Sequence, residues 1–392
     1  MKIAIIDPVG SKAGIDHYDL SLLSGLKNAG DNCFLYSNFN YEEGIIHYKK
    51  YFHNVGVSKI SSIISNFIGF FKSLSDAKMQ KVDWLILHVF RAGAFDLFTF
   101  TLAKLMGFKL LAIVHDIESL DTITLPIVRR TVISSLPDLR VVHNQFCKDE
   151  IAKQISDKAL NTTGIIPHVN FIKLFNRYHS NTNLKNDLLN DKNAIRSLDS
   201  KLLNAVNANE KIILFFGQIK KSKGVDVLLE AIPYCKTNFK VVVAGKLRGE
   251  NWEKYQSIID SKKLNEKVIP IIRHINDYER DILFALAQGI ILPYRYIYQS
   301  GVLLMTMSFP MAVIASNLPP NADIIIDSEN GFLFEAENSN DLAIKIDALI
   351  NNSELDQIKI RAISDINAKN SPDVIGMQYH QLLANPIELL YH

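Results

Sequence analysis

The sequence IILFFGQIKKSKGVDVLLEAI, residues 212–232, decides the fold of the second half of the chain. Its first five residues are apolar and end at Gly217, which predicts a buried parallel strand followed by a turn. Apolar residues recur at helical spacing from Val225 to Ile232, so a helix is expected after the loop. A strand, a short glycine-bounded loop and a helix in this order form the building unit of a doubly wound α/β domain.

The same alternation extends in both directions along the chain. Apolar runs predict further strands in the second half at 240–244, 268–272, 290–292 and 312–315, and in the first half at 3–6, 33–36, 84–87, 110–114, 139–142 and 165–167. Residues 171–210 contain clusters of Asn, Asp and Lys and are predicted to be a linker with some helix. We therefore expect an α/β domain over 1–170 and a second one that begins at residue 211.

Composition excludes several classes of protein. The 392 residues are 48% hydrophobic and 21% charged, as in an ordinary globular protein. The 43 Lys and Arg against 41 Asp and Glu leave a net charge of only +2, which argues against a nucleic-acid partner. The three cysteines are far apart, with no disulfide or metal spacing, and fit a reduced cytoplasmic compartment. The sequence contains no apolar run typical of a signal peptide or of a membrane-spanning helix.

Two loops in the second half have the composition of anion sites. The loop 217–224 follows a strand, opens a helix and carries three lysines, so Lys223 and backbone amides next to Gly217 are candidates to hold a phosphate. In the second loop, Ser300-Gly301 opens a helix and Arg295 offers a bidentate partner for an anion. For each loop a purely structural interpretation remains open. The lysines of the first loop can simply be solvated, and Gly301 in the second can simply relieve crowding between helix and sheet.

The first half offers a candidate acid/base group. His115-Asp116 directly follows the predicted strand 110–114, where a histidine can orient a sugar hydroxyl or exchange a proton near neutral pH. Gly10 and Gly14 bracket a loop of small residues after the first strand. A purely structural role for the lone histidine is the alternative.

These pieces, in this order, resemble the GT-B glycosyltransferases of family 4, the glycosyl transferases group 1. Residues 215–231 look like the family's "FVGR…KGVDxLLEA" segment, and 242–245 resemble its "vvaG" strand. Residues 313–316 and 330–334 are similar to "PVIAS…NGfLf", and 166–170 to "IPNGVD". The resemblance is dense from about residue 139 to 350.

The resemblance implies a GT-B fold, in which two Rossmann-like domains face each other across a cleft. It implies a donor domain over 211–371, and a C-terminal segment 372–392 whose helix returns to the acceptor domain. Lys223, Gly217, Arg295, Ser300 and Gly301 would then bind the donor diphosphate, with His115 and Asp116 as catalytic candidates. Gly10 and Gly14 would lie on the acceptor side.

The sequence departs from the family pattern at three positions. Gln218 stands where the family usually has an arginine after the glycine, and the paired glutamates align with Ile297 and Met305. The paired-glutamate motif is therefore degenerate, and the hypothesis is that Arg295 compensates for the missing loop arginine. No clear D-x-D pair is present, so no metal and no other cofactor is expected.

Residues 45–80 indicate a further partner. Five lysines stand against one acid, Asp76, and apolar residues recur at helical spacing among aromatic ones. Such a helix can lie on an anionic membrane, which would make the enzyme peripheral on the inner face of the cell membrane. The alternative is an ordinary helix that packs its apolar stripe on the sheet.

The resulting prediction is a hexosyltransferase of class EC 2.4. It would move a sugar from a nucleotide-diphosphate sugar to a glycan or lipid-linked saccharide acceptor in bacterial surface polysaccharide synthesis, with retention of anomeric configuration. The alternatives are a nucleotide-sugar epimerase of GT-B fold and a non-catalytic subunit that binds nucleotide sugars.

Overall fold

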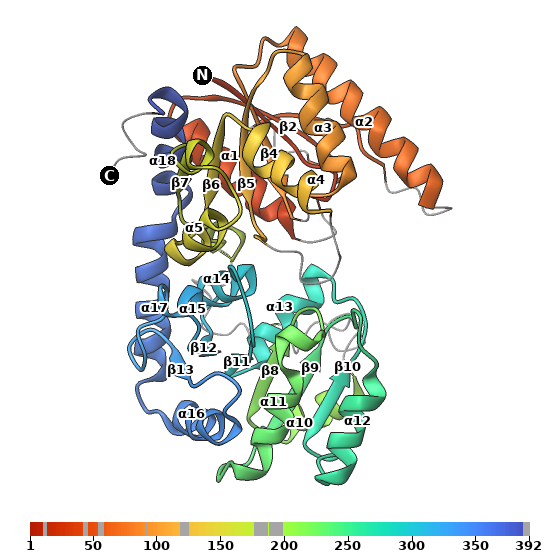
Figure 1. The fold of residues 1–392 in the computed structure, drawn as a ribbon. Helices are drawn as coiled ribbons and strands as arrows, with labels where there is room; N and C mark the ends of the chain where they lie inside the picture. Colours follow the sequence, from red (N-terminus) through yellow and green to blue (C-terminus); the bar gives the residue numbers. More distant parts are fainter. Residues whose placement is uncertain are drawn as a thin grey trace. The chain divides into compact units, whose positions relative to one another are not determined.

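The chain forms two compact units (Figure 1). The computed structural model describes residues 1–10, 14–41, 46–53, 59–90, 92–117, 125–175, 187 and 199–386. Unit 1 comprises Met1–Phe171 and Ala368–His392, and unit 2 comprises Ile172–Asn367. The second boundary falls within the last turn of a helix, α17 (Leu355–Asn370).

Unit 1 contains a seven-stranded, fully parallel sheet in the order β3-β2-β1-β4-β5-β6-β7. Its strands are β1 (Lys2–Ile6), β2 (Asn32–Ser37), β3 (His47–Lys50), β4 (Trp84–Val89), β5 (Lys109–Val114), β6 (Leu139–Val142) and β7 (Thr163–Ile165). The helices are α1 (Ile15–Asn28), α2 (Lys59–Met79), α3 (Ala94–Leu105), α4 (Pro126–Arg130) with the π-turn η2 (Thr131–Ser135), α5 (Gln145–Ala152), α6 (Asp157–Leu160) and α18 (Pro372–Ala384).

Unit 2 contains a six-stranded, fully parallel sheet in the order β10-β9-β8-β11-β12-β13. Its strands are β8 (Ile212–Phe216), β9 (Lys240–Ala244), β10 (Val268–Ile271), β11 (Gly289–Leu292), β12 (Ala312–Ser316) and β13 (Phe332–Phe334). The helices are α10 (Ser200–Asn207), α11 (Val225–Ala231), α12 (Trp252–Ser261), α13 (Asp277–Leu286), α14 (Gly301–Ser308), α15 (Pro319–Ala322), α16 (Ser339–Asn351) and α17, with short 3-10 turns η3 (Ile172–Phe175), η4 (Lys221–Lys223) and η5 (Ile232–Tyr234).

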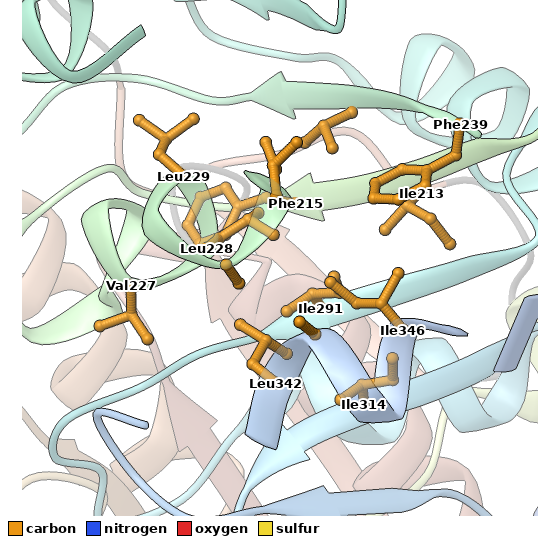
Figure 2. Close-up of a cluster of buried hydrophobic side chains, with 14 of the residues drawn as sticks. Ile213, Phe215, Val227, Leu228, Leu229, Phe239, Ile291, Ile314, Leu342 and Ile346 are labelled. Atoms are coloured by element: carbon orange, nitrogen blue, oxygen red, sulfur yellow. The ribbon is translucent and has the colours of Figure 1, made fainter. Parts of the chain in front are cut away.

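The core of unit 2 lies between its sheet and the helices α11 and α16. Figure 2 shows Leu228 of α11 and Leu342 of α16 facing side chains of the central strands, among them Phe215 and Ile291. All four side chains are fully buried. Helices cover the sheet, so strands such as β8 are apolar throughout rather than alternating.

The last helix completes the core of unit 1. α18 packs along α1, and the two helices meet where glycines face each other: a Cβ on Gly25 would lie 1.7 Å from the carbonyl oxygen of Pro372. A Cβ on Gly376 would in turn lie 2.1 Å from the carbonyl carbon of Gly25. Only glycine permits this approach. It lets Tyr379 and Leu382 join the buried cluster under α1.

The predicted strands are present, with three differences. The sequence analysis missed β3, whose four residues HYKK lack an apolar pattern, and β13, which has three residues. It also placed the strand at 165–167, whereas β7 spans Thr163–Ile165. Finally, part of the predicted linker belongs to a domain, because α10 buries Leu202, Ala205 and Val206 in unit 2.

The structure therefore draws the domain boundaries at 171/172 and 367/368 instead of at 170, 210 and 371. Most of the predicted linker, residues 176–186 and 188–198, lies outside the described residues. Among the residues that the structure describes, no helix is long and apolar enough to cross a membrane.

Candidate functional site

The switch point of the second sheet brings two predicted loops together. β8 lies between β9 and β11, so the chain winds in opposite directions from this strand. In open α/β sheets, ligands bind outside the carboxyl ends of the strands at such a point. The loops that follow β8 and β11, residues 217–224 and 293–301, are called the switch-point loops below.

The switch-point loops are held to each other by backbone contacts. The backbone N–H of Arg295 donates to the carbonyl of Ser222 at 2.9 Å. Gly224 has φ +66°, and a Cβ there would lie 1.9 Å from the carbonyl oxygen of Pro293. The glycine is therefore required both by its left-handed backbone and by the close approach of the second loop.

Lys223 lies on an aromatic ring of the other loop. Its Nζ is 3.6 Å from the ring centre of Tyr294, a cation–π contact. Tyr294 is buried, and burial raises the pKa of its hydroxyl above the ordinary value. The lysine side chain is half-buried. The structure thus places Lys223 at the switch point with its ammonium group oriented by Tyr294.

Arg295 is engaged by two carboxylates. Its Nη1 and Nη2 donate to the two carboxylate oxygens of Asp226 at 2.8 and 3.1 Å, and its Nε donates to Glu337 at 2.7 Å. Burial alone would raise the pKa of Asp226, but the hydrogen bonds and charge of Arg295 outweigh it and lower that pKa. Arg295 thus ties the loops to α11. A contact between Arg295 and a diphosphate would compete with its ion pairs to Asp226 and Glu337. The role of Arg295 as a diphosphate ligand stays a prediction.

Ser300 and Gly301 begin α14, as the sequence analysis predicted. The Ser300 hydroxyl accepts a hydrogen bond from the backbone N–H of Leu303 at 3.1 Å, so it caps this helix. A Cβ on Gly217 would lie 3.8 Å from Val302, which places the start of α14 beside the first switch-point loop. The two positions of the degenerate glutamate pair, Ile297 and Met305, are half-buried.

In unit 1, four buried histidines lie at or just after the ends of four adjacent strands. His88 stands near the end of β4, His115 follows β5, His143 follows β6 and His168 follows β7. Neighbouring rings have centroids 5.0, 5.3 and 5.3 Å apart, and Tyr18 of α1 contacts all four edge-on. We call these four residues the histidine row.

The histidine row is neutral near pH 7. Burial lowers the pKa of His88 and of His168 to about 4 and that of His143 to about 3, and it holds the pKa of His115 well below its ordinary range. The other rings of the row lower the pKa of His115 further, since a positive charge on one disfavours a charge on the next. The row therefore offers hydrogen-bonding groups instead of cations.

Two buried carboxyl groups lie beside the row at the switch point of the first sheet. Asp19 of α1 has its Oδ1 2.8 Å from Nε2 of His88. Burial and the charge of Asp19 raise the pKa of Asp7, at the end of β1, to about 7, and burial raises the pKa of Asp19 well above its ordinary value. Asp7 accepts hydrogen bonds from the backbone N–H groups of Val9 and Gly10.

The predicted residues of unit 1 lie around this cluster. His115 is 3% exposed, and its Nε2 lies 2.8 Å from Nδ1 of His88. Asp116 is half-buried, Gly10 binds Asp7, and Gly14 has φ +72° at the start of α1. The centre of the loop bracketed by Gly10 and Gly14, residues 11–13, lies outside the described residues. The catalytic role of His115 and Asp116 stays a prediction.

Sequence reasoning missed most of the cluster. His143 and His168 follow strands just as His115 does, and His88 lies at the end of one, so the available signal was their recurrence at strand ends. Asp226 and Glu337, which bind Arg295, carry no comparable signal. Across the described ranges, no group of His, Cys, Asp and Glu has the geometry to hold a metal ion.

Comparison with known proteins shows what the chain is similar to. Residues 201–364 match the family model of the glycosyl transferases group 1, so this part of the chain is similar to the domain of that family. This match confirms the resemblance seen in the sequence. An uncharacterised glycosyltransferase of Methanocaldococcus jannaschii is 32% identical over 142 residues, 36% of this chain and 39% of that protein. The capsular polysaccharide biosynthesis glycosyltransferase CapM of Staphylococcus aureus is 28% identical over 173 residues, 42% of each chain.

A solved structure extends the likeness to the fold of both units. Anabaena HepE, crystallised with UDP and glucose, superposes with a TM-score of 0.72 at 16% identity and covers 98% of this chain and 99% of its own. The prediction of two Rossmann-like domains of GT-B type is thereby confirmed. The matched segments span about 40% of the length of the curated relatives.

The contact between the switch-point loops makes Gly224 sensitive to substitution. We expect Gly224→Ala to destabilise unit 2 by about 3 kcal/mol, since the left-handed backbone is strained and the loops must move apart. Gly249→Ala is the matched control: its φ is +67°, nothing lies within 4 Å, and about 1 kcal/mol is expected. Urea unfolding, followed by hydrogen exchange of unit 2, measures the loss of stability in both variants. Equal losses of stability in Gly224→Ala and Gly249→Ala would contradict the close approach of the two loops.

The buried cluster makes the stability of unit 1 depend on pH. In the unfolded chain each imidazole binds a proton below about pH 6.5, whereas in the folded protein the row stays neutral down to about pH 4. Folding therefore releases these protons, and stability rises with pH through this range. Asp7 and Asp19 act in the opposite direction, because the folded protein retains protons that the unfolded chain has lost. Because four imidazoles outnumber two carboxyl groups, we expect the free energy of unfolding to rise with pH. The expected net slope near pH 5 is about 3 kcal/mol per pH unit.

The slope can be measured by urea unfolding in a Trp252→Phe background, where Trp84 of unit 1 is the remaining tryptophan. His143→Gln removes one imidazole and should lower the slope by about 1.4 kcal/mol per pH unit. His53→Gln, at an exposed position, should leave it unchanged. Equal slopes for the wild type and His143→Gln would contradict the neutral row.

Proposed function

We propose that this protein is a glycosyltransferase that moves a sugar from a nucleoside-diphosphate sugar to a saccharide or lipid-linked saccharide acceptor. We further propose that it retains the anomeric configuration and acts in bacterial surface polysaccharide synthesis. The observation that carries the proposal is the position of the switch-point loops within the region that matches the glycosyl transferases group 1. The likeness to CapM and to HepE, whose structure holds UDP and glucose, supports the substrate class.

Lys223 is the proposed direct ligand of the diphosphate. Departure of a nucleoside diphosphate leaves negative charge, which a cation in a partly buried site stabilises strongly. The face of Tyr294 holds the Lys223 ammonium at the switch point, and Gly224 brings the second loop against the first. The start of α14 at Ser300 and Gly301, beside Gly217, adds backbone amides of the kind that bind anions.

Arg295 is proposed to act on the same diphosphate by fixing the loop around Lys223. Its guanidinium donates to Asp226, to Glu337 and to the carbonyl of Lys221 at 3.1 Å. These contacts hold both switch-point loops and α11 together. A direct contact of Arg295 with phosphate requires at least one of the carboxylate pairs to break.

His115 and Asp116 are proposed to lie on the acceptor side in unit 1. Burial keeps the His115 ring neutral, so it is suited to orienting a hydroxyl rather than to pairing with an anion as a cation. Gly10 and Gly14 are proposed to lie on the same acceptor side. Neither Ile297 nor Met305 can accept ribose or sugar hydroxyls, so other groups must bind the donor where the family has glutamates.

The helix α2 is proposed as the surface that meets an anionic membrane. Its C-terminal half packs on unit 1 through Phe70 and Leu74. Its N-terminal half extends away from the sheet in Figure 1. The helix exposes large apolar side chains to about half of their area, namely Ile63, Ile64, Ile68 and Phe71. Phe98 of α3 packs edge-on against Phe67 and extends this apolar face.

The charges around this face fit anionic lipid. Lys72 on α2 and Lys49 and Lys50 on β3 are exposed, whereas the acid of this segment, Asp76, is buried and accepts a hydrogen bond from Tyr36. An exposed apolar face flanked by lysines lies in the plane of the headgroups, with its apolar side in the acyl boundary. Such docking would bring the enzyme to a lipid-linked acceptor.

Binding of UDP-glucose and a panel of other nucleotide sugars, measured by titration calorimetry, tests the donor site. We expect Lys223→Ala to weaken binding of the preferred nucleotide sugar about 10- to 100-fold, the effect of losing a hydrogen bond to a charged group. Lys221→Ala, in the same loop and exposed, is the matched control and should bind as the wild type does. Unchanged affinity in Lys223→Ala would overturn the assignment.

A product assay with the bound nucleotide sugar separates the remaining functions. Transfer to a saccharide acceptor supports the proposal. Formation of an isomerised nucleotide sugar would instead identify an epimerase, and binding without turnover on any acceptor would identify a non-catalytic subunit.

Membrane docking is tested by co-sedimentation with phosphatidylcholine vesicles that contain or lack phosphatidylglycerol. We expect binding to the anionic vesicles that falls with added salt. Replacing Ile64 and Ile68 by Ser, or Lys49 and Lys50 by Glu, should weaken it. Ile344→Ser, at a position 65% exposed on α16 of unit 2, is the control and should have no effect. Equal binding to neutral and anionic vesicles would count against this surface.

A further inference from the structure

Arg295 of the second switch-point loop uses two sides of its guanidinium group. At the end of the group, Nη1 and Nη2 donate to the two carboxylate oxygens of Asp226 at 2.8 and 3.1 Å, and Nη1 also donates to the carbonyl of Lys221 at 3.1 Å. On the Nε side, Nε donates to Oε1 of Glu337 at 2.7 Å. A guanidinium has five N–H groups, and these four bonds use four of them. The fifth, on Nη2, points to the Nε side beside the Glu337 contact.

The two carboxylates hold Arg295 to different extents. Asp226 accepts two hydrogen bonds and its side chain is 20% exposed, whereas Glu337 accepts one and is 63% exposed. An ion pair that is open to water contributes little to stability, because water solvates both partners when they separate. The pair of Arg295 with Glu337 is therefore the one that an incoming anion displaces at the smaller cost.

The backbone of Glu337 has a conformation that favours glycine. The N–H of Asn338 donates to the carbonyl of Glu335 at 3.0 Å, which closes a turn with Glu337 as its third residue, and Glu337 has φ +64°. Glycine or asparagine is the usual residue at this turn position when φ is positive. A side chain kept in such a conformation is an indication of function. The turn itself gives no reason for a glutamate, whereas the contact with Arg295 does.

The displaced side chain has room to move. Glu337 lines a hollow of about 510 Å³ on the surface of unit 2, together with Glu230 and Glu335. Both of these carboxylates are already engaged, since Glu230 lies 2.6 Å from Nζ of Lys262 and Glu335 accepts a hydrogen bond from Nδ2 of Asn338 at 2.7 Å. The Glu337 side chain can thus turn from Arg295 into the hollow while its backbone stays in the turn.

We propose that Glu337 is a displaceable carboxylate that occupies the Nε side of Arg295 until a phosphate group of the ligand replaces it. A phosphate can take that side with two oxygens, through Nε–H and the fifth N–H, where Glu337 makes a single bond. Asp226 keeps the end of the guanidinium, so Arg295 stays attached to α11 while it binds the anion. That the phosphate belongs to the donor diphosphate rests on the proposed function. Glu337 is then a specificity-determining residue, because only a ligand that outcompetes a carboxylate gains the contact.

Titration calorimetry of the full chain with inorganic pyrophosphate tests the competition. Glu337→Gln removes the charge and keeps the size of the side chain, so we expect pyrophosphate to bind about two- to fivefold more tightly, the range measured for exposed ion pairs. Glu337→Gly should give a similar gain, because the gain comes from loss of the carboxylate. Glu335→Gln is the matched control: it removes one charge from the same turn, its carboxylate binds Asn338, and wild-type affinity is expected.

A second variant ties the gain to the guanidinium. In an Arg295→Met background, Glu337→Gln should no longer tighten binding, because no guanidinium remains to be uncovered. An unchanged affinity in Glu337→Gln would overturn the proposal. So would an equal gain in Glu335→Gln, or a gain that persists in the Arg295→Met background.

Nitrogen NMR shows the displacement itself. In protein labelled with ¹⁵N arginine, Arg295→Met identifies the Nε–H signal of Arg295. We expect this signal to differ between the wild type and Glu337→Gln without pyrophosphate, and to reach one common position in both proteins at saturation, where the same phosphate oxygens accept the hydrogen bond. A wild-type signal that does not move at saturation would contradict the proposal, as would failure of pyrophosphate to bind either protein.

The transfer assay separates this inference from the proposed function. If pyrophosphate displaces Glu337 but no nucleotide sugar is turned over, the proposed function fails and the inference stands. If sugar is transferred but neither the affinity nor the Arg295 signal depends on Glu337, the inference fails and the function stands.

Discussion

In both units every strand runs parallel to its neighbours, and the rest of the molecule depends on this constraint. A parallel sheet gathers the ends of its strands at one edge, so the loops that follow them become neighbours even when they are far apart in sequence. Residues 217–224 and 293–301 meet for this reason, as do the four members of the histidine row. The chemistry of each unit is thus assembled by strand order rather than by sequence proximity.

The two edges carry contrasting electrostatics. At the edge of the second sheet, Lys223 and Arg295 are cations whose contacts with Tyr294 and Asp226 keep them oriented and partly accessible. At the edge of the first sheet, burial suppresses charge on the imidazoles and raises the pKa of the carboxyl groups. One edge therefore has the character of an anion site, and the other has that of a neutral hydrogen-bonding site, which suits the proposed donor site and the proposed acceptor site respectively.

Sequence reasoning recovered the fold because apolar runs such as 212–216 and 110–114 belong to strands covered on both faces. It failed where that signal is absent: β3 is short and polar, and α10 sits in a segment rich in polar residues. For the candidate site, it proposed Lys223, Ser300 and His115 from their positions after strands, and their roles stay predictions. It missed the partners of Arg295 and the rest of the histidine row, because those pairings depend on strand order and on helices such as α1 and α11 that a linear pattern does not place.

The glycine contact between α1 and α18 has a consequence for the order in which the molecule is built. In chain order, unit 2 is an insertion between the two parts of unit 1, so its whole length leaves the ribosome before α18 exists. Until then the face of α1 that holds Tyr18 lacks the helix that seals it, and Tyr18 is the residue against which all four imidazoles rest. The histidine row is thus sealed only after α18 has been made. The chemical state of one edge of the first sheet is completed by a helix that follows the whole of unit 2 in the chain.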